Sequence, residues 1–479
     1  MNTTKDRWYT GITRYQWLVL AIASIGWMFD IFEGQIFVAS MNEAMPSFLT
    51  ETDPEARKTQ AEFFNQVALV SFLLGGTLGG VFFGMMSDRI GRKKTMAYSI
   101  LFYSFFTWMT AFSMAWWHLA VLRFFVAIGV GGQWAVASAY VAETFPSKAR
   151  AHTASIFHAF GSFGTLLAAL VGALLLGNAA VLTWCETSSL MTWLHHWYEP
   201  TTLPWRLCFA LGLVPSILVF FIFAWLKEPE SWKAAKEQAK KDPTQKVGSI
   251  ADLFQKSTRR STIIGVTLAA IGMATFWGVH VRGKDTMRIA AENQMVAEGK
   301  VDVIEEDGKT KRNLTADQTA ELKRWEMLGM VIATLGLLLG QLSFGPLSQR
   351  IGRRGAFVFY HIGAFFIAII VFQLTTSLTS VTPLYFLLPI FGLFTAAMHS
   401  GYAVYFPELF PTRLRGTGTG FCFNMGRLMA SPFLLITGWM VTWGGFSLLG
   451  ALTVLSFLYL LGPVAVLYAR ETRGQELME

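Results

Sequence analysis

The sequence predicts an all-α membrane protein with twelve transmembrane helices in two pseudo-symmetric six-helix bundles. Three observations support this fold class: an apolar composition, twelve long apolar runs, and two motifs that each occur twice. Hydrophobic residues make up 53% of the 479 residues and charged residues only 15%. An ordinary soluble domain carries about 25% charged residues. The composition therefore favours a chain whose solvent is largely the lipid bilayer.

Each apolar run is long enough to cross a bilayer as a helix, because about 20 residues span the hydrocarbon core. A helix also satisfies its own backbone hydrogen bonds where no water is present. The first run is longer than the apolar region of a secretory signal, so we expect it to remain as the first membrane helix. The predicted spans are residues 15–40, 61–86, 95–114, 117–142, 152–176, 206–226, 261–281, 326–348, 355–374, 382–405, 416–440 and 446–469.

Basic residues predict the orientation, because cytoplasmic loops of membrane proteins are enriched in Lys and Arg. With the N-terminus inside, the short outer loops carry only Arg57 and Lys58. Both termini are therefore expected in the cytoplasm, with the protein in the plasma membrane or a bacterial inner membrane. The cations of the short inner loops are Arg89, Arg92, Lys93, Lys94, Lys148, Arg150, Arg350, Arg353, Arg354, Arg413 and Arg415.

The net charge of +8 follows from this bias. Because the cations flank membrane helices, the expected partners are the lipid bilayer, protons and a small-molecule substrate, and no nucleic acid. The chain has no P-loop and no His-Glu-x-x-His motif, which argues against an ATP-driven pump and a membrane metalloprotease. We predict a transporter rather than an enzyme, with no catalytic residues, cofactor or metal site.

Two long connections divide the chain. Residues 227–260 contain nine Lys or Arg residues and are predicted to form a cytoplasmic linker with an amphipathic surface helix. The predicted domains are an N-terminal bundle over residues 1–226 and a C-terminal bundle over residues 261–479. The second bundle contains a charged outer insertion, residues 282–325, with nine basic and nine acidic residues. For this insertion we expect either a small helical cap or no regular structure.

Two motifs occur once in each half of the chain. Residues 84–94 read Gly-Met-Met-Ser-Asp-Arg-Ile-Gly-Arg-Lys-Lys, and residues 345–354 read Gly-Pro-Leu-Ser-Gln-Arg-Ile-Gly-Arg-Arg. These segments are 261 residues apart. In the second motif, Glu143, Pro146 and Arg150 recur 265 residues later, as Glu, Pro and Arg in the same spacing. The two offsets indicate an internal repeat.

We interpret these motifs as a cytoplasmic gate whose ion pairs form in one conformation and break in the other. Gly91 permits a tight turn. Asp88 is expected to cap a helix terminus, and Glu143 to reach Arg89 or Arg150. The alternative is that the cations only fix the topology. The predicted gate residues are Asp88, Arg89, Gly91, Arg92, Glu143, Arg150, Arg350, Gly352, Arg353, Glu408 and Arg415.

These motifs resemble those of the major facilitator superfamily, and the resemblance covers the whole chain. Residues 84–94 are similar to the superfamily's loop motif between the second and third helices, and residues 227–231 and 471–474 are similar to its motifs after the sixth and last spans. The resemblance implies alternating access by two six-helix bundles around a site near the membrane midplane, in a protein that works as a monomer.

The first and fourth spans narrow the resemblance. Residues 27–33 resemble the acidic first-helix signature of proton-coupled organic-acid symporters, and residues 131–134 resemble the Gly-Gly-Glu-Trp of the sialic-acid and lactate branch. Gln133 replaces that branch's glutamate, which removes one titratable group. Trp134 is expected to line the site, with helix packing as the alternative. The resemblance implies proton-coupled symport of a small organic anion; the alternatives are a sugar or neutral-metabolite porter and, third, a multidrug exporter.

Asp30, Glu33 and Arg123 lie inside predicted spans. An ionised side chain there costs at least ~2.5 kcal/mol on insertion scales, so these groups and Arg427 are expected to face each other or a water-filled chamber between the bundles. Glu33 and Arg123 lie at similar depths, so we expect them to pair. Asp30 lies one turn deeper, and its protonation would let Arg123 alternate between the two carboxylates. The alternative is a permanent ion pair that only joins two helices.

Arg427 and Asn424 share one face of the eleventh span, where a guanidinium and an amide suit a substrate carboxylate. The alternative for Arg427 is a bond to a carbonyl or a rim carboxylate. In the repeat, Ser162 corresponds to Arg427. His158 and His399 are expected to bind substrate or carry protons, unless each is a neutral hydrogen-bonding group between helices. The predicted substrate-binding residues are Arg427, Asn424, Gln133, His158, Ser162, His399, Tyr402 and Trp134.

Overall fold

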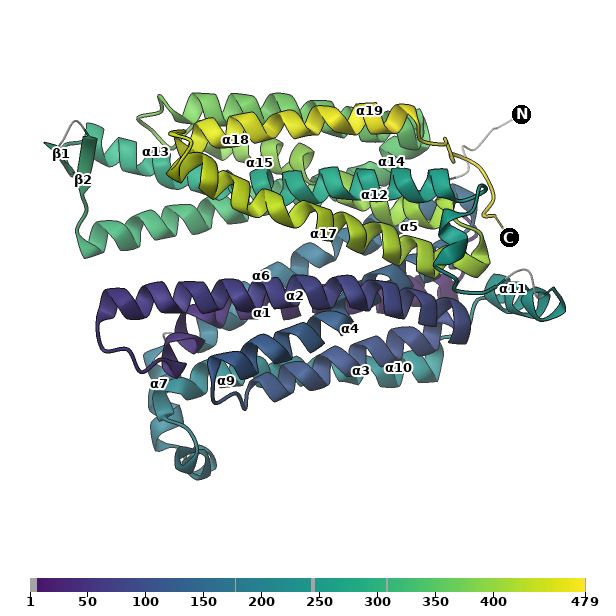
Figure 1. Cartoon of the computed structure of the whole chain (residues 1–479), viewed down its shortest axis with the longest axis horizontal. Helices are drawn as coiled ribbons and strands as arrows, with labels where there is room; N and C mark the ends of the chain where they lie inside the picture. Colours follow the sequence, from purple (N-terminus) through teal and green to yellow (C-terminus); the bar gives the residue numbers. More distant parts are fainter. Residues whose placement is uncertain (1–6, 177, 243–245, 307–308, 479) are drawn as a thin grey trace. The chain divides into compact units, whose positions relative to one another are not determined.

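The computed structural model describes residues 7–176, 178–242, 246–306 and 309–478. Most of this chain is helical (Figure 1). The helices up to the linker are α1 (Arg14–Ala44), α2 (Pro54–Ile90), α3 (Arg92–Thr110), α4 (Trp116–Thr144), α5 (Ser147–Ala159), α6 (Gly161–Leu175), α7 (Ala179–Thr187), α8 (Ser189–Thr192), α9 (Leu203–Ala210), α10 (Ile217–Trp225) and α11 (Glu230–Lys241). The later helices are α12 (Arg259–Thr275), α13 (Gly283–Ala297), α14 (Ala316–Thr375), α15 (Leu384–Thr395), α16 (Met398–Tyr405), α17 (Arg415–Thr442), α18 (Leu448–Ser456) and α19 (Leu461–Leu467).

Among the described residues, nine helical stretches are long and apolar enough to cross a membrane. One of them, residues 317–375, covers the eighth and ninth predicted spans, because its helical geometry is interrupted at Gly352, where the first of two helices ends and the second begins. Helices α3 and α17 lie at the third and eleventh predicted spans. The nine stretches and these two helices thus account for twelve crossings, and the predicted fold class is confirmed.

The turns that end the second and eighth spans are built alike. Gly91 has φ 114° and ψ 158°, and Gly352, within the stretch numbered α14, has φ 86° and ψ 165°. Positive φ is accessible to glycine without the strain that a Cβ atom adds. Each glycine also lies against a carboxylate, Glu228 or Glu471, that a Cβ atom would overlap. The predicted tight turns are therefore present in both halves.

Glycines also allow a close helix crossing in each half. On α2, a Cβ atom at Gly75 or Gly79 would overlap a backbone carbonyl of α4. On α14, Gly336 and Gly340 meet carbonyls of α15 in the same way. The two pairs of glycines are 261 residues apart, as the loop motifs are. Small residues at helix interfaces let backbones pack closely in lipid, and the repeated contact supports the pseudo-symmetry of the two bundles.

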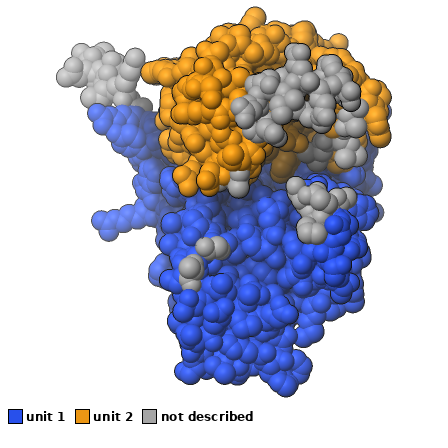
Figure 2. All heavy atoms as spheres, turned by 90° about the vertical axis from the view of Figure 1, so that its left-hand side faces the viewer, with its two compact units in different colours: residues 1–263, 406–428, 475–479 blue, residues 264–405, 429–474 orange. Residues whose placement is uncertain are grey.

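Packing divides the chain into two compact units, which Figure 2 shows in different colours. Unit 1 comprises Met1–Ile263, Phe406–Leu428 and Gln475–Glu479, and unit 2 comprises Ile264–Tyr405 and Met429–Gly474. The first half of α17 thus packs with the N-terminal helices. Because the units follow packing rather than chain order, the predicted domain boundaries at residues 226 and 261 stay a prediction.

The outer insertion differs from the expectation of a helical cap or no regular structure. Helices α13 and α14 extend into it, and strands β1 (Asp302–Glu306) and β2 (Lys309–Asn313) form an antiparallel hairpin between them (Figure 1). Glu326 near the base of the insertion binds Lys284 at 2.6 Å. This ion pair joins α13 and α14 at the base of the insertion.

Candidate functional site

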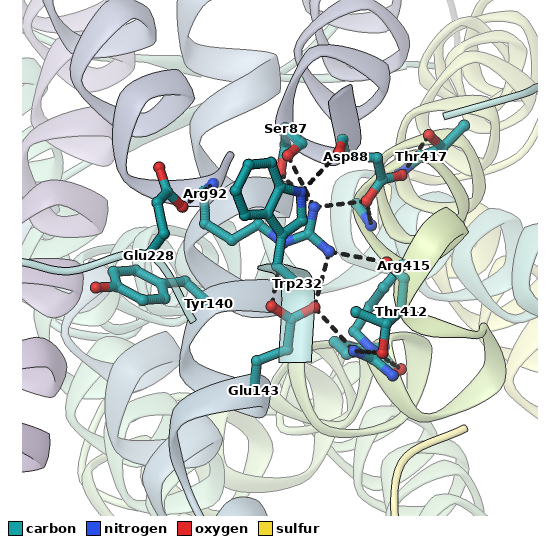
Figure 3. Close-up of polar contacts among 12 residues, drawn as sticks. Ser87, Asp88, Arg92, Tyr140, Glu143, Glu228, Trp232, Thr412, Arg415 and Thr417 are labelled. Atoms are coloured by element: carbon teal, nitrogen blue, oxygen red, sulfur yellow. Dashed lines mark hydrogen bonds and ion pairs between the residues drawn. The ribbon is translucent and has the colours of Figure 1, made fainter. Parts of the chain in front are cut away.

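A buried charged cluster in unit 1 centres on Arg92 at the start of α3 (Figure 3). Its guanidinium donates to Asp88 Oδ1 at 2.7 Å and to Glu143 Oε1 at 2.8 Å. The same Glu143 oxygen accepts a bond from Arg415 at 2.8 Å. All four side chains are fully buried. We call Asp88, Arg92, Glu143 and Arg415 the Arg92 cluster; it joins α2, α3, α4 and α17.

Asp88 also caps α17. Its carboxylate accepts bonds from the backbone N–H of Gly416 at 3.0 Å and of Thr417 at 2.8 Å, and from the Thr417 hydroxyl at 2.6 Å. These N–H groups lie at the positive end of the helix dipole and have no partner within the helix. The predicted capping role of Asp88 is confirmed, and its partner is the eleventh span.

The predicted partners of Glu143 are wrong. It pairs with Arg92 and Arg415 rather than with Arg89 or Arg150. Arg89 donates instead to the carbonyl of Gly248 in the linker at 3.2 Å. Arg150 approaches Glu408 at 3.8 Å, so the two copies of the second motif meet each other. Loop spacing alone could not identify these partners, because they come from distant segments of the chain.

Glu228 and Glu471 are two carboxylates that the sequence analysis left without a role. Glu228 accepts a bond from the backbone N–H of Arg92 at 2.7 Å, and Glu471 accepts one from that of Arg353 at 3.0 Å. Each therefore caps the helix that follows a glycine turn. The signal available in the sequence is their shared position, after the sixth and the last span.

The repeat of the Arg92 cluster in unit 2 is less charged. Arg353 is buried and donates to the Ser348 carbonyl at 3.4 Å, as Arg92 donates to the Ser87 carbonyl. Gln349 occupies the position that corresponds to Asp88. Arg350 presents its carbonyl to Arg473 at 2.6 Å. The capping carboxylate of the first motif is thus missing from the second.

Trp232 on the linker helix α11 also contacts the cluster, a contact that the sequence analysis missed. Its indole N–H donates to the backbone carbonyl of Asp88 at 2.7 Å, and the side chain is buried (Figure 3). Helix α11 ends in exposed lysines, so its polar face is solvated while Trp232 anchors it. A single tryptophan in a lysine-rich segment is the only signal that the sequence offers for this anchor.

A second buried polar group lies within the helices of unit 1. Glu33 on α1 accepts a bond from Arg123 on α4 at 3.2 Å, as predicted. The Arg123 guanidinium also lies over the rings of Phe37 and Phe72, at 4.8 and 4.5 Å. The Asp30 oxygens accept no hydrogen bond within 3.5 Å among the described residues, and the hydroxyl of Tyr103 on α3 lies near them. We call Asp30, Glu33 and Arg123 the carboxylate group.

The sequence allowed the side chains of the carboxylate group either to face each other or to face a water-filled chamber, and Glu33 and Arg123 adopt the first arrangement. Asp30, Glu33 and Arg123 are each at most 1% exposed. Glu33 lies close to Thr107 of α3 and to Gly212, at which an added Cβ atom would be 3.3 Å from the second Glu33 oxygen. Packed helices surround these side chains in this conformation.

Arg427 on α17 lies apart from this group. Its guanidinium is half-buried over the ring of Phe423, at 5.2 Å, and no carboxylate among the described residues pairs with it. Asn424 uses its amide N–H groups for helix packing, since it donates to the carbonyls of Gly420 at 2.9 Å and Gly131 at 3.3 Å. The Arg427 guanidinium therefore has no carboxylate partner among the described residues. The Asn424 amide nitrogen, in contrast, is hydrogen-bonded to α4 and to its own helix.

The other predicted binding residues divide between the units. Gln133 lies inside unit 1 and accepts a bond from Ser99 at 2.7 Å. His158 accepts a bond from Trp134 at 3.0 Å, and Ser162 follows on α6, nearly buried. In unit 2, His399 bonds the carbonyl of Ala396 at 3.1 Å, and Tyr402 donates to that of Leu268 at 2.8 Å. These bonds join helices or turns, which is the alternative given above for His158, His399 and Trp134.

Comparisons with known proteins place these features in a family. The model of the Major Facilitator Superfamily matches residues 17–284, and that of the family Sugar (and other) transporter matches residues 261–473. The chain is 25% identical to the cis,cis-muconate transport protein of Acinetobacter baylyi, over 84% of each protein. It is 25% identical to a sialic acid transporter of Escherichia coli, over 89% of this chain and 88% of the relative. The structure of the proton:xylose symporter XylE of E. coli matches with a TM-score of 0.64 at 17% identity, over 97% of this chain and 98% of that one.

Proposed function

The chain belongs to the major facilitator superfamily and is a secondary transporter rather than an enzyme, and on that premise we propose that it takes up a small organic anion together with protons. The observation that carries the proton coupling is the contrast between two neighbouring carboxyl groups. Glu33 has Arg123 as a counter-ion, whereas Asp30 is buried with no hydrogen-bond partner among the described residues.

An ionised carboxylate buried in this way is costly, whereas a protonated one is neutral. The surroundings of Asp30 therefore favour its protonated, neutral form. When Asp30 loses its proton, it becomes a second anion one turn from Glu33, and Arg123 gains a competing partner. The proton state of Asp30 thereby changes the relative stability of the two access states.

Arg427 is the proposed substrate anchor. A half-buried guanidinium without a carboxylate partner suits a bidentate bond to a substrate carboxylate. The named substrates of two relatives are consistent with this anchor, since muconate and sialic acid both carry carboxylates. Gln133, bonded to Ser99, is a position for helix packing in this proposal rather than one for substrate.

The Arg92 cluster is the proposed cytoplasmic gate, and in this structure it is closed. Its ion pairs and the cap on α17 join helices that must separate for substrate to leave inward. This role assumes cytoplasmic termini, which the distribution of Lys and Arg supports. The proposed location is a bacterial inner membrane, and the proposed working form is a monomer.

Uptake into proteoliposomes tests the function. Radiolabelled cis,cis-muconate, sialic acid and xylose are offered with and without an inward proton gradient. We expect accumulation of at least one of the two carboxylates above equilibrium, only with the gradient. The Arg427→Lys variant keeps the charge but loses the planar fork, and should weaken the apparent affinity about tenfold or more. Anion uptake that is equal with and without the proton gradient would refute the proposed proton coupling.

A sugar porter is the second candidate. The match of residues 261–473 to the sugar transporter model and the likeness of fold to a xylose symporter favour it. The same assay separates the two candidates: gradient-driven accumulation of xylose without uptake of either carboxylate would replace the anion proposal.

A further inference from the structure

Four aromatic side chains of unit 1 form a continuous chain of contacts from α1 to α17. Trp27 donates to the carbonyl of His158 at 3.0 Å, and their rings stack at 5.5 Å. Trp134 donates to His158 Nδ1 at 3.0 Å and stacks on Phe423 at 3.9 Å. All four side chains are at most 6% exposed. We call Trp27, His158, Trp134 and Phe423 the aromatic relay.

Both indole N–H groups of the relay donate to His158, so His158 connects the two tryptophans. An indole N–H can only donate, so the Nδ1 atom that faces Trp134 must carry a lone pair. In a membrane helix bundle an indole N–H without a partner costs free energy. Trp134 and Trp27 therefore both depend on the position of His158. His158 lies in the last turn of α5, directly before the break at Phe160 that separates α5 from α6.

The two ends of the relay reach the two proposed sites. Trp27 lies three residues before Asp30 on α1, about 4.5 Å along the helix axis. At the other end, the Arg427 guanidinium lies over Phe423, 5.2 Å from the ring centroid. Gly76 of α2 lies on another side of that guanidinium, since an added Cβ atom would be 2.9 Å from Nη1. Phe423 and the backbone of Gly76 thus lie against Arg427, which has no paired carboxylate among the described residues.

We propose that the aromatic relay couples the proton state of Asp30 to the affinity of Arg427 for a substrate carboxylate. A shift of α1 moves Trp27, and the bonds at His158 pass this displacement to Trp134 and then to Phe423. The Arg427 fork changes direction with the ring beneath it. The relay residues are positioning residues, since none of them binds the proton or the substrate. By linkage, substrate on Arg427 changes the proton affinity of Asp30 by the same factor.

Charged and titratable groups lie at both ends of the relay, and His158 is a titratable group within it. Arg427 lies at one end and Asp30 at the other, with Glu33 on the same helix, Arg123 on α4 and Tyr103 on α3. The coupling depends on the proposed proton symport and gives that proposal a route between two sites on different helices.

The test uses Trp134→Phe, which removes the indole N–H and keeps an aromatic ring on Phe423. Two measurements with radiolabelled cis,cis-muconate and sialic acid are made in proteoliposomes: exchange at equal pH on both sides, and accumulation under an inward proton gradient. We expect exchange within about twofold of the wild type, whereas gradient-driven accumulation falls tenfold or more. The wild-type dependence of KM on pH should flatten.

The matched control is Trp205→Phe. Trp205 is equally buried in unit 1 but packs against Phe48 and lies outside the relay. It should leave both measurements unchanged. If Trp134→Phe does not fold, Trp27→Phe makes the same test at the other end of the relay, because it removes the indole N–H that donates to the His158 carbonyl.

Exchange and accumulation that fall together, or a variant that keeps wild-type coupling, would overturn the relay. This outcome differs from failure of the proposed function, in which the wild type itself shows no gradient-driven accumulation. A double-mutant cycle between Trp27→Phe and Trp134→Phe adds a second criterion, because residues that act through one network give non-additive effects.

Discussion

Asp30 and Glu33 are chemically similar and lie one helical turn apart, but their surroundings differ. Arg123 forms an ion pair with Glu33, whereas Asp30 has no ion-pair partner among the described residues. Asp30→Asn mimics a permanently protonated group. We expect it to abolish accumulation under a proton gradient and to spare exchange of preloaded substrate, measured in proteoliposomes. Equal loss of both activities would assign Asp30 a structural role instead.

Glu33→Gln is the matched comparison. It leaves Arg123 buried without a counter-ion, a change that typically costs about 3–5 kcal/mol. We expect a lower unfolding temperature for Glu33→Gln than for Asp30→Asn, and loss of both exchange and accumulation. A stable Glu33→Gln protein with normal exchange would show that the ion pair contributes little to the fold.

At the residue scale, the sequence predicts which side chains are unusual better than it predicts their partners. Charges inside apolar runs identify Asp30, Glu33 and Arg123 at once, because membrane insertion penalises them. Helix periodicity and depth in the membrane are enough to predict the ion pair between Glu33 and Arg123. They could not show that Glu143 reaches Arg415, since that contact depends on how the fourth and eleventh spans pack.

At the element scale, Glu471 stabilises the start of the ninth span. Burial raises the pKa of Glu471, but hydrogen bonds from the backbone N–H groups of Arg353, Arg473 and Arg354 outweigh this effect and lower the pKa. A lowered pKa stabilises the fold at pH above the ordinary glutamate value of about 4.3, and this stabilisation is lost as the pH falls through the lower folded value. Glu471→Gln should therefore cost about 1 kcal/mol near pH 7, the size of a helix cap.

Thermal unfolding in detergent between pH 3 and pH 7 measures this effect. The unfolding temperatures of wild type and Glu471→Gln should converge below about pH 4. Glu230→Gln is the control, because Glu230 lies on α11 with its side chain 85% exposed. A gap between wild type and Glu471→Gln that stays constant with pH would contradict the capping role.

The elements themselves were largely predictable. Long apolar runs give the spans, and glycine in a repeated loop motif gives both tight turns. The hairpin of β1 and β2 was not predictable, because a segment with balanced charges has neither the alternation of a strand nor the periodicity of a helix. The hairpin connects the ends of α13 and α14, and this position, which the composition does not reveal, restricts the conformations of the segment.

For the whole molecule, the proposed topology places α11 in the cytoplasm and the insertion outside. Lys240→Cys and Lys300→Cys test it, since both side chains are about two-thirds exposed. A membrane-impermeant maleimide should label residue 300 in right-side-out vesicles and residue 240 only in inverted vesicles. The native cysteines Cys185, Cys208 and Cys422 are buried, so their background should be low. The reverse pattern would place the Arg92 cluster on the outer face.

Alternating access requires the Arg92 cluster to open, which links its charges to the conformation of the whole protein. Glu143→Gln removes the carboxylate that Arg92 and Arg415 share. Two buried guanidinium groups then lose a counter-ion, at a cost of about 3–5 kcal/mol to the closed state. The equilibrium should shift towards the state in which the cluster is open and hydrated.

A cysteine at Ala135 reports this shift. Ala135 is fully buried on α4 beside Gly420 of α17, at which an added Cβ atom would be 3.3 Å from the Ala135 methyl group. With the cluster open, maleimide should label Ala135→Cys at least tenfold faster in the Glu143→Gln background. Ala368→Cys, fully buried within unit 2, should stay unlabelled in both backgrounds. Faster labelling of both cysteines would indicate general unfolding, and unchanged labelling at residue 135 would mean that Glu143 does not hold the gate closed.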